Sequence, residues 1–306
     1  MTKFNEEASP RASGDALAKL GMPRVIAGMW RVREWGMSAS ELVDFIHGCI
    51  DRGVTAFDHA DIYGRGAVES LFGEALELDP SLRGKIQIIS KAGIRFPSSS
   101  TGGVKYYDSS SGYLREACEE SLKRLKTDHL DLFLIHRPDS LSSTDDIARA
   151  AQTLMEQGKI RAFGVSNFST RHFELLHAKT SLATNQIEFS PFEPGALDSA
   201  MFESLAQANV SPMIWSPLGG GRLFSETDEV ARRVRDVMTE LQHKHGASNW
   251  LAIAYAWIFR LPCVPYVISG SRRIESIQTA LDGLKIDLSR QDWYAILEAA
   301  RGQPVP

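Results

Sequence analysis

The sequence contains little cysteine, and that scarcity excludes two kinds of small scaffold. Its 306 residues include three cysteines, Cys49, Cys118 and Cys263, at wide spacings and without a CxxC pair. A disulfide framework or a zinc knuckle needs paired or closely spaced cysteines. We therefore expect reduced thiols, a cytoplasmic location and no bound metal.

Long apolar runs and an excess of basic charge are also missing. No stretch of about 18 apolar residues occurs, and the first residues are polar, without the apolar core of a signal peptide. The 34 Lys and Arg residues are balanced by 38 Asp and Glu residues, a formal net charge of −4. A dedicated nucleic-acid binder is usually strongly basic. We expect neither a membrane-spanning protein nor a nucleic-acid binder, and look instead for a small-molecule partner.

From about residue 24 onward, the chain alternates regularly between two sequence patterns. Short apolar runs rich in β-branched residues alternate with stretches whose apolar residues recur every three or four positions, as in helices. Eight runs predict strands, at 24–29, 54–57, 86–90, 130–135, 160–165, 183–187, 210–215 and 264–268. Eight strand–helix repeats are typical of an α/β fold whose parallel sheet closes into a single (β/α)8 TIM barrel.

The stretches between the runs predict the helices of this barrel. They cover 39–51, 68–78, 113–125, 146–158, 170–178, 198–208, 250–260 and 273–284. Several follow a hydroxyl side chain that can cap a helix, namely Ser38, Ser111, Thr144 and Ser169. Two further stretches predict an extra helix at 226–243, after the seventh strand, and a C-terminal helix at 289–299.

No linker divides the chain, so we expect one barrel domain over residues 23–306, preceded by a flexible N-terminal arm over 1–22. Residues 92–111 are rich in Ser and Gly and follow the third strand. Loops of this length in a compact domain often bind ligands. Together with 30–36 and 219–226, this loop is expected to form the walls of a substrate pocket.

Polar residues follow the predicted strands at the end where barrels of this kind carry their active sites. Asp58 and Tyr63 come after the second strand, Lys91 after the third and His136 after the fourth. Because neighbouring strand ends lie close together, we expect these side chains to meet. The later strands end in Ser166 and Asn167, in Gln186, in the loop that starts at Ser216, and in Gly270, Ser271 and Arg272.

This group of side chains suits proton donation to a carbonyl oxygen. A phenol is a weak acid, with a reference pKa of about 10, and an ammonium group beside Tyr63 would lower that pKa. A carboxylate would keep the Lys91 ammonium charged, and a neutral imidazole could hydrogen-bond the carbonyl oxygen. No side chain supplies hydride, so the chemistry would require a nicotinamide cofactor.

Six segments resemble the aldo-keto reductases, in order and over about residues 22–300: AFDHADIYGRGAVESLFGEAL, IISKAG, LDLFLIHRPD, IRAFGVSNFS, TNQIEFSPF and IWSPLGGGRLF. The resemblance implies a (β/α)8 barrel that reduces aldehydes and ketones with NADPH. It implies a catalytic tetrad of Asp58, Tyr63, Lys91 and His136. The cofactor contacts that it implies are Ser166, Asn167 and Gln186 at the carboxamide, Trp215 at the nicotinamide face, Ser216, Pro217, Leu218 and Gly219 at the pyrophosphate, and Gly270, Ser271 and Arg272 at the adenosine phosphate.

The chain departs from the commoner family pattern at two cofactor positions. Trp215 stands where a tyrosine is usual, although an indole stacks equally well. The stretch VISGSRR lacks a Pro-Lys-Ser pattern, so a 2′-phosphate would depend on Ser271, Arg272 and additionally Arg273. Their charge favours NADP over NAD.

Two other functions are compatible with the same residues. Lys91 could act as the nucleophile of a Schiff-base enzyme, which would leave Tyr63 and Trp215 without roles. Alternatively, the barrel could bind NADPH as a regulatory or sensor subunit with slow turnover. The complete tetrad favours an enzyme, whose particular carbonyl substrate and oligomeric state the sequence leaves open.

Overall fold

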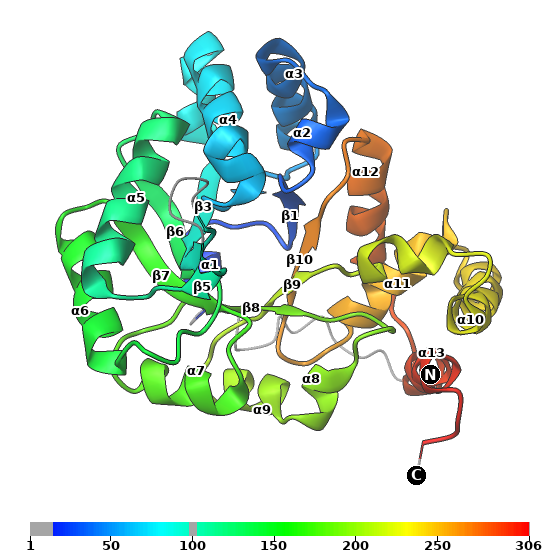
Figure 1. Ribbon diagram of the computed structural model, residues 1–306. Helices are drawn as coiled ribbons and strands as arrows, with labels where there is room; N and C mark the ends of the chain where they lie inside the picture. The colour runs from blue at the N-terminus through cyan, green and yellow to red at the C-terminus, as the bar shows by residue number, and fades with distance from the viewer. Residues whose placement is uncertain (1–14, 98–102, 306) are drawn as a thin grey trace.

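The computed structural model describes residues 15–97 and 103–305. Eight parallel strands close into a barrel in the order β1-β10-β9-β8-β7-β6-β3-β2, with helices around it (Figure 1). The barrel strands are β1 (Val25–Gly28), β2 (Ala56–Asp58), β3 (Gln87–Ala92), β6 (Leu130–Ile135), β7 (Ile160–Ser166), β8 (Asn185–Glu188), β9 (Met213–Trp215) and β10 (Tyr266–Ser269). The predicted single (β/α)8 barrel and its eight strands are confirmed.

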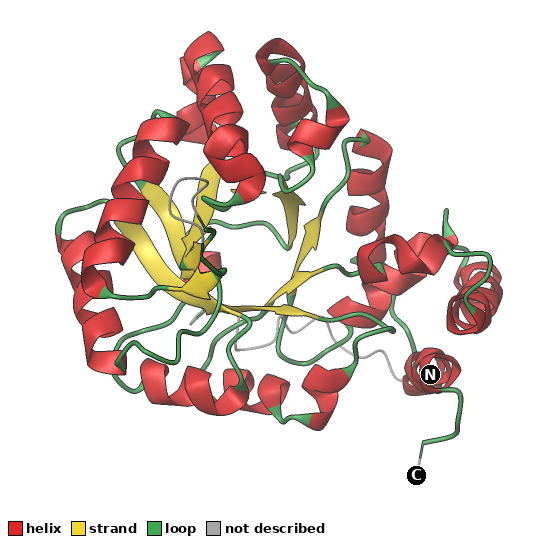
Figure 2. Cartoon of the chain, viewed as in Figure 1, coloured by secondary structure: helices red, strands yellow, loops and turns green. Residues whose placement is uncertain are grey.

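The helices are drawn red in Figure 2, and all but the first lie in a ring outside the yellow barrel. They are α1 (Ala16–Lys19), α2 (Val32–Trp35), α3 (Ala39–Ile50), α4 (Ala67–Leu78), α5 (Ser111–Leu125), α6 (Thr144–Glu156), α7 (Thr170–His177), α8 (Gly195–Asp198), α9 (Met201–Gln207), α10 (Glu229–His245), α11 (Trp250–Phe259), α12 (Ile274–Gly283) and α13 (Arg290–Arg301). The extra helix after the seventh strand is α10, and the C-terminal helix is α13, as predicted.

The strands are apolar on both faces because both faces are buried. Every residue of β6 is buried, and side chains alternate between two layers. Leu132 and Leu134 belong to the cluster inside the barrel, whereas Phe133 and Ile135 pack in the larger cluster under the helices. This double burial makes the barrel a rigid frame for the residues at its strand ends.

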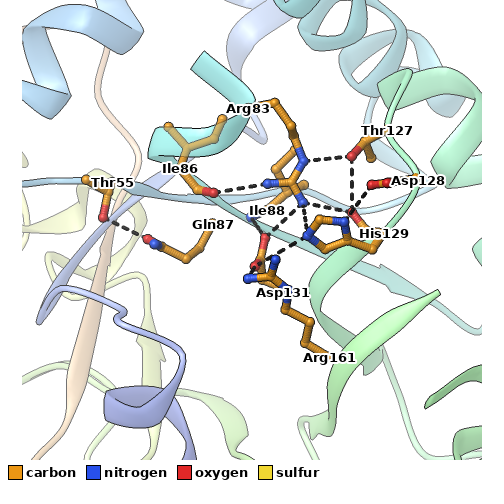
Figure 3. Close-up of polar contacts among 10 residues, drawn as sticks. All are labelled: Thr55, Arg83, Ile86, Gln87, Ile88, Thr127, Asp128, His129, Asp131 and Arg161. Carbon is orange, nitrogen blue, oxygen red and sulfur yellow. Dashed lines mark hydrogen bonds and ion pairs between the residues drawn. The ribbon is translucent and has the colours of Figure 1, made fainter. Parts of the chain in front are cut away.

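A cluster of hydrogen bonds and ion pairs links three strands at the amino end of the barrel (Figure 3). The buried Asp131 carboxylate of β6 accepts a hydrogen bond from the backbone N–H of Ile88 in β3, at 2.8 Å. It also pairs with Arg83 at 3.2 Å and with Arg161 of β7 at 3.0 Å. The carboxylate thus fixes these strands opposite the end at which Lys91 and His136 lie.

Helix starts agree with the sequence in part. Ser38 and Ser169 cap α3 and α7 through their side chains, as predicted. In two other helices the cap lies one residue earlier than expected, so the predictions of Ser111 and Thr144 were wrong and the caps are Ser110 and Ser143. Ser110 and Ser111 both carry a hydroxyl, as do Ser143 and Thr144, and each helix begins so that the earlier residue of the pair is its cap.

Two predicted segments have more structure than their composition indicated. The helix expected over 198–208 is divided into α8 and α9, because Ala200 between them has a left-handed backbone, with φ of 54°. The expected loop 92–111 carries a small antiparallel pair, β4 (Ile94–Arg95) and β5 (Tyr106–Tyr107). This pair brings residues near both ends of the long loop to the mouth of the barrel.

Most of the predicted N-terminal arm, residues 1–14, lies outside the described residues. The following segment contains α1, whose Leu17 is fully buried, and Met22 is buried as well. Both pack in the cluster inside the barrel. From residue 15 to residue 22 the chain is therefore packed rather than loose, since apolar side chains at this point complete the barrel interior.

Candidate active site

A buried lysine lies at the centre of the polar cluster at the carboxyl end of the barrel. The Lys91 Nζ of β3 donates hydrogen bonds to Asp58 Oδ2 at 2.7 Å, to the backbone carbonyl of His59 at 2.7 Å and to Tyr63 Oη at 3.2 Å. The second oxygen of Asp58 accepts from Gln186 Nε2 at 2.9 Å. The structure thus brings together the ends of β2, β3 and β8 around one ammonium group.

Neighbouring groups raise the pKa of Lys91, whereas the Lys91 charge lowers the pKa of Tyr63. Burial alone would lower the pKa of Lys91, but Asp58 and Tyr63 raise it above its usual value, so the side chain is an ammonium. Burial raises the pKa of Tyr63 above its usual value, and this effect outweighs the lowering by Lys91. The lowering by the Lys91 ammonium is thus present as expected, but burial outweighs it, so Tyr63 holds its proton.

His136 follows β6, and its backbone N–H donates to the carbonyl of Ala92 in β3 at 2.7 Å. Its ring lies edge-on to Tyr63, with the ring centroids 6.0 Å apart. Burial, together with the nearby Lys91 charge, holds the pKa of His136 well below its usual value. The imidazole is therefore neutral, and its Nδ1 has no hydrogen-bond partner among the described residues.

A pocket of about 540 Å³ opens over this cluster. Asp58, Tyr63 and His136 line one part of it, and Lys91 lies buried behind them. The other predicted residues on its wall are Ser166, Asn167, Gln186, Trp215, Ser216, Pro217, Leu218, Gly270 and Ser271. Gly219 and Arg272 are not on the wall. The volume lies within the usual range for sites of small molecules and cofactors.

One wall of the pocket is an indole held in place by an amide. Trp215 Nε1 at the end of β9 donates to Asn167 Oδ1 at 3.1 Å. Asn167 Nδ2 in turn donates to Ser166 Oγ at 2.8 Å, and Ser166 Oγ donates to the backbone carbonyl of Gln186 at 2.9 Å. This chain of hydrogen bonds orients the flat face of Trp215 beside the polar side chains.

The loop after β9 curves around the next part of the pocket. Ser216, Gly219, Gly220 and Gly221 all have left-handed backbone, with φ between 52° and 100°. A side chain at Gly220 or Gly221 would meet nothing within 4 Å, whereas one at Gly219 would clash with Phe192. Gly219 therefore packs the loop against the protein, and the following two glycines face open space.

The far part of the pocket is lined by the start of α12. Ser271 and Arg273 lie on its wall, as do Ser276 and Thr279 in the first turns of the helix. Arg272 is directed elsewhere, and its guanidinium donates to the backbone carbonyl of Trp35 at 3.4 Å. Of the two adjacent arginines, Arg273 faces the pocket and Arg272, the one expected from the sequence at the adenosine phosphate, does not.

Three cations on the same wall were not singled out as site residues from the sequence: Arg31 and Lys105, which lie in the predicted wall segments 30–36 and 92–111, and Arg137. A signal for Arg137 was present, since it directly follows His136 in the motif LIHRPD. The three loops expected to shape the pocket do contribute to it, through Trp30, Ile94 and Phe224 among others. Trp35 instead packs against the core.

A metal centre finds no support in the described part of the chain, where no group of three or more potential ligands occurs. The described cysteines Cys49 and Cys118 are buried, and burial raises the pKa of each thiol to about 12. Likewise, no helix in the described ranges is long and apolar enough to span a membrane.

Comparison with known proteins agrees with this geometry. The family model "Aldo/keto reductase family" matches residues 24–301. The chain belongs to the aldo/keto reductase family. It is 42% identical to Oxidoreductase YdhF of Escherichia coli strain K12 over 285 residues, which cover 92% of this chain and 95% of that protein.

Solved structures of the family have the same fold. The glycerol dehydrogenase AKR11B4 from Gluconobacter oxydans superposes with a TM-score of 0.80 at 26% identity, covering 93% of this chain and 94% of that one. The aldo/keto reductase from Klebsiella pneumoniae, solved in complex with NADP and acetate, has a TM-score of 0.73 at 26% identity and covers 93% of both chains. The barrel is thus the family fold over nearly its whole length.

Proposed function

We propose that this protein reduces the carbonyl group of an aldehyde or ketone with NADPH, with Tyr63 as the proton donor. The observation that carries the proposal is the arrangement around Lys91. One ammonium bonds both Asp58 and Tyr63, and the phenol lies beside a neutral His136 on the wall of one pocket. Membership of the family supports the reaction class, and the solved relative that holds NADP supports the cofactor.

The pocket wall offers a suitable group for each part of the dinucleotide. The fixed indole of Trp215 provides a flat surface for the nicotinamide ring, and Ser166, Asn167 and Gln186 provide polar atoms for its carboxamide. The open glycine loop after Ser216 lets backbone groups approach a pyrophosphate. Ser271 and Arg273, at the positive end of α12, suit the adenosine phosphate.

Each side chain of the cluster then has a defined task. When bound, a nicotinamide cofactor would supply the hydride for the carbonyl carbon. Tyr63 Oη gives its proton to the carbonyl oxygen, and the Lys91 ammonium at 3.2 Å stabilises the phenolate left behind. Asp58 keeps Lys91 charged and oriented, while neutral His136 donates a hydrogen bond that orients the carbonyl.

The Schiff-base alternative is disfavoured by the state of the lysine. A nucleophilic amine must lose its proton, whereas Lys91 is buried, bonded to three oxygens and has a raised pKa. The regulatory alternative predicts tight binding of NADPH with slow turnover. A neutral, proton-bearing Tyr63 on the pocket wall favours turnover instead.

Replacing the phenol tests the proposal. Tyr63→Phe should reduce kcat for a simple aldehyde by on the order of 10²–10⁴-fold, because general acid catalysis contributes about this much. The dissociation constant for NADPH should stay close to that of the wild type, since the ring remains. Steady-state kinetics and a fluorescence titration measure the two quantities.

A matched control is Tyr294→Phe, which removes the hydroxyl of an exposed tyrosine on α13. It should leave both quantities unchanged. If Tyr63→Phe turned over substrate at the wild-type rate, the proton donor would be assigned wrongly. If the wild type bound NADPH tightly but reduced no aldehyde, ketone or quinone, the regulatory function would be favoured.

A further inference from the structure

The charged side chains on the pocket wall are almost all positive. Among the described residues that line the pocket, Asp58 alone carries a carboxylate, and it already bonds Lys91 and Gln186. The lining cations are Arg31, Lys105, Arg137 and Arg273. This excess of positive charge contrasts with the whole chain, whose formal net charge is −4.

Two of these cations lie around the reacting groups. Arg137 directly follows His136, is half-buried, and places its guanidinium carbon 5.9 Å from the centroid of the Trp215 ring. Lys105 is exposed, just before β5, with its Nζ 6.0 Å from the centroid of Tyr107. Both charges help to lower the pKa of His136, which agrees with their nearness to it.

Neither cation has a polar partner in the described part of the protein. The side chains of Lys105 and Arg137 form no ion pair or hydrogen bond with any other described residue. Glu188 at the end of β8 is near enough for Arg137 to affect its pKa, but the two do not form an ion pair. A half-buried guanidinium without an ion-pair or hydrogen-bond partner on a pocket wall is available to a ligand.

The cofactor does not account for these two charges. On the proposed function, Ser271, Arg273 and the glycine loop would hold its phosphates, whereas Lys105 and Arg137 lie nearer to His136. Cations there would instead meet the part of the substrate that extends beyond its carbonyl group.

We propose that the substrate is a carbonyl compound with an anionic group, a carboxylate or a phosphate, which Arg137 binds directly and Lys105 attracts. The inference rests on the proposed function and adds the substrate class to it. A guanidinium donates paired hydrogen bonds that match both anions. The exposed ammonium of Lys105 acts mainly through its charge and is weakened by salt.

Four benzaldehydes that differ only in the para group test the charge preference. 4-Carboxybenzaldehyde and 4-formylphenyl phosphate are anionic, methyl 4-formylbenzoate is neutral, and 4-formyl-N,N,N-trimethylanilinium is cationic. With NADPH, kcat/KM for at least one anion should exceed that for the neutral ester by on the order of ten- to a hundredfold. The better of the two anions identifies carboxylate or phosphate as the preferred group.

Two variants locate the preference. Arg137→Gln should lower the ratio of kcat/KM for the better anion to that for the ester by roughly tenfold or more. Lys105→Gln should lower it by about threefold at low salt and less at high salt. Both substrates are measured on one preparation. Partial unfolding of a variant therefore lowers both values of kcat/KM by the same factor and leaves their ratio unchanged. Lys85→Gln, an exposed cation at the amino end of the barrel, should leave the ratio unchanged.

The possible outcomes separate this inference from the proposed function. Reduction of the neutral ester as fast as both anions would overturn the anionic substrate and leave carbonyl reduction intact. If Arg137→Gln slowed the ester and the anion equally, Arg137 would position Trp215 or His136 and the inference would also fail. If no aldehyde were reduced by the wild type, the proposed function itself would fail.

Discussion

Asp61 is a second carboxyl close to the reacting groups, half-buried on the turn between β2 and Tyr63. Its Oδ2 accepts a hydrogen bond from Tyr113 Oη at 3.2 Å, and its Oδ1 has no hydrogen-bond partner among the described residues. Burial, with help from nearby Glu69, raises the pKa of Asp61 to about 7 from a reference value of 3.8. The folded protein therefore holds a proton that the unfolded chain releases at lower pH.

The raised pKa predicts a stability that falls with pH. Between about pH 4 and 7 the folded state binds more protons than the unfolded state, so the free energy of unfolding decreases as pH rises through this window. Asp61→Asn removes the ionisation and keeps an oxygen acceptor for Tyr113. We expect the variant to be more stable than the wild type at pH 8, by roughly 2–4 kcal/mol, with a smaller gain at pH 5.

Urea unfolding at the two pH values measures this difference. Asp44→Asn, at an exposed position on α3, is the matched control and should show no pH-dependent gain. A variant with the same gain at pH 5 and pH 8 would mean that Asp61 does not hold the extra proton.

At the scale of elements, the contact between α4 and α5 depends on a glycine. A Cβ at Gly73 of α4 would lie 2.1 Å from the backbone carbonyl oxygen of Arg124 in α5, so only a glycine permits this close approach. The 3-10 turn η1 (Tyr63–Gly66) leads directly into α4. The packing of this helix pair therefore also sets where Tyr63 lies.

We expect Gly73→Ala to destabilise the protein by about 1–3 kcal/mol, the usual cost of overpacking a tight contact. Alanine favours a helix over glycine by up to about 1 kcal/mol, so this loss would occur against a favourable propensity. Gly112, in the first turn of α5, has nothing within 4 Å of an added Cβ. Gly112→Ala should be neutral or stabilise by up to about 1 kcal/mol.

Thermal and urea unfolding of the two variants provide the comparison. Equal effects of Gly73→Ala and Gly112→Ala would show that α4 and α5 can move apart at no cost. A Gly73→Ala protein that folds should also have a lower kcat, because the turn before α4 holds Tyr63.

At the scale of the whole molecule, barrel closure assembles the proposed cofactor site from both ends of the chain. β1 pairs with β10, with Ala27 opposite Ser269, and both Gly28 and Gly270 line the pocket. Asp58 lies on β2 and Lys91 on β3, whereas Tyr63 and His136 lie on the segments that follow β2 and β6. One dinucleotide placed as proposed would therefore contact strand ends from most of the barrel.

Cofactor choice is predicted to depend on the arginine that faces this pocket. Arg273→Ala should raise the dissociation constant for NADPH by roughly ten- to a hundredfold and leave that for NADH nearly unchanged, because only NADPH carries the 2′-phosphate. Higher salt should reduce the wild-type preference. Fluorescence titration with both cofactors at two salt concentrations measures the effect.

The adjacent Arg272→Ala is the control, since that side chain bonds the Trp35 carbonyl and is not on the pocket wall. Equal losses for NADPH and NADH in Arg273→Ala would place Arg273 away from the phosphate. A loss of NADPH affinity confined to Arg272→Ala would return the contact to the residue that the sequence pattern indicates.

The sequence by itself determined the barrel, the order of its strands and the side chains at their carboxyl ends. Strand and helix periodicities are local, and parallel strands joined by helices close in only a few ways. For that reason the sequence alone predicts Asp58, Tyr63, Lys91 and His136 at one rim.

Only the tertiary structure decided the protonation states of these groups and which side chains surround them. The pKa of Tyr63 depends on burial against charge, and burial is set by segments distant in sequence. Which of two adjacent arginines faces the pocket depends on the first turn of α12. That Lys105 and Arg137 line one pocket depends on the pairing of β4 with β5 near the mouth of the barrel, because spatial proximity between distant residues is a property of packing and not of local pattern.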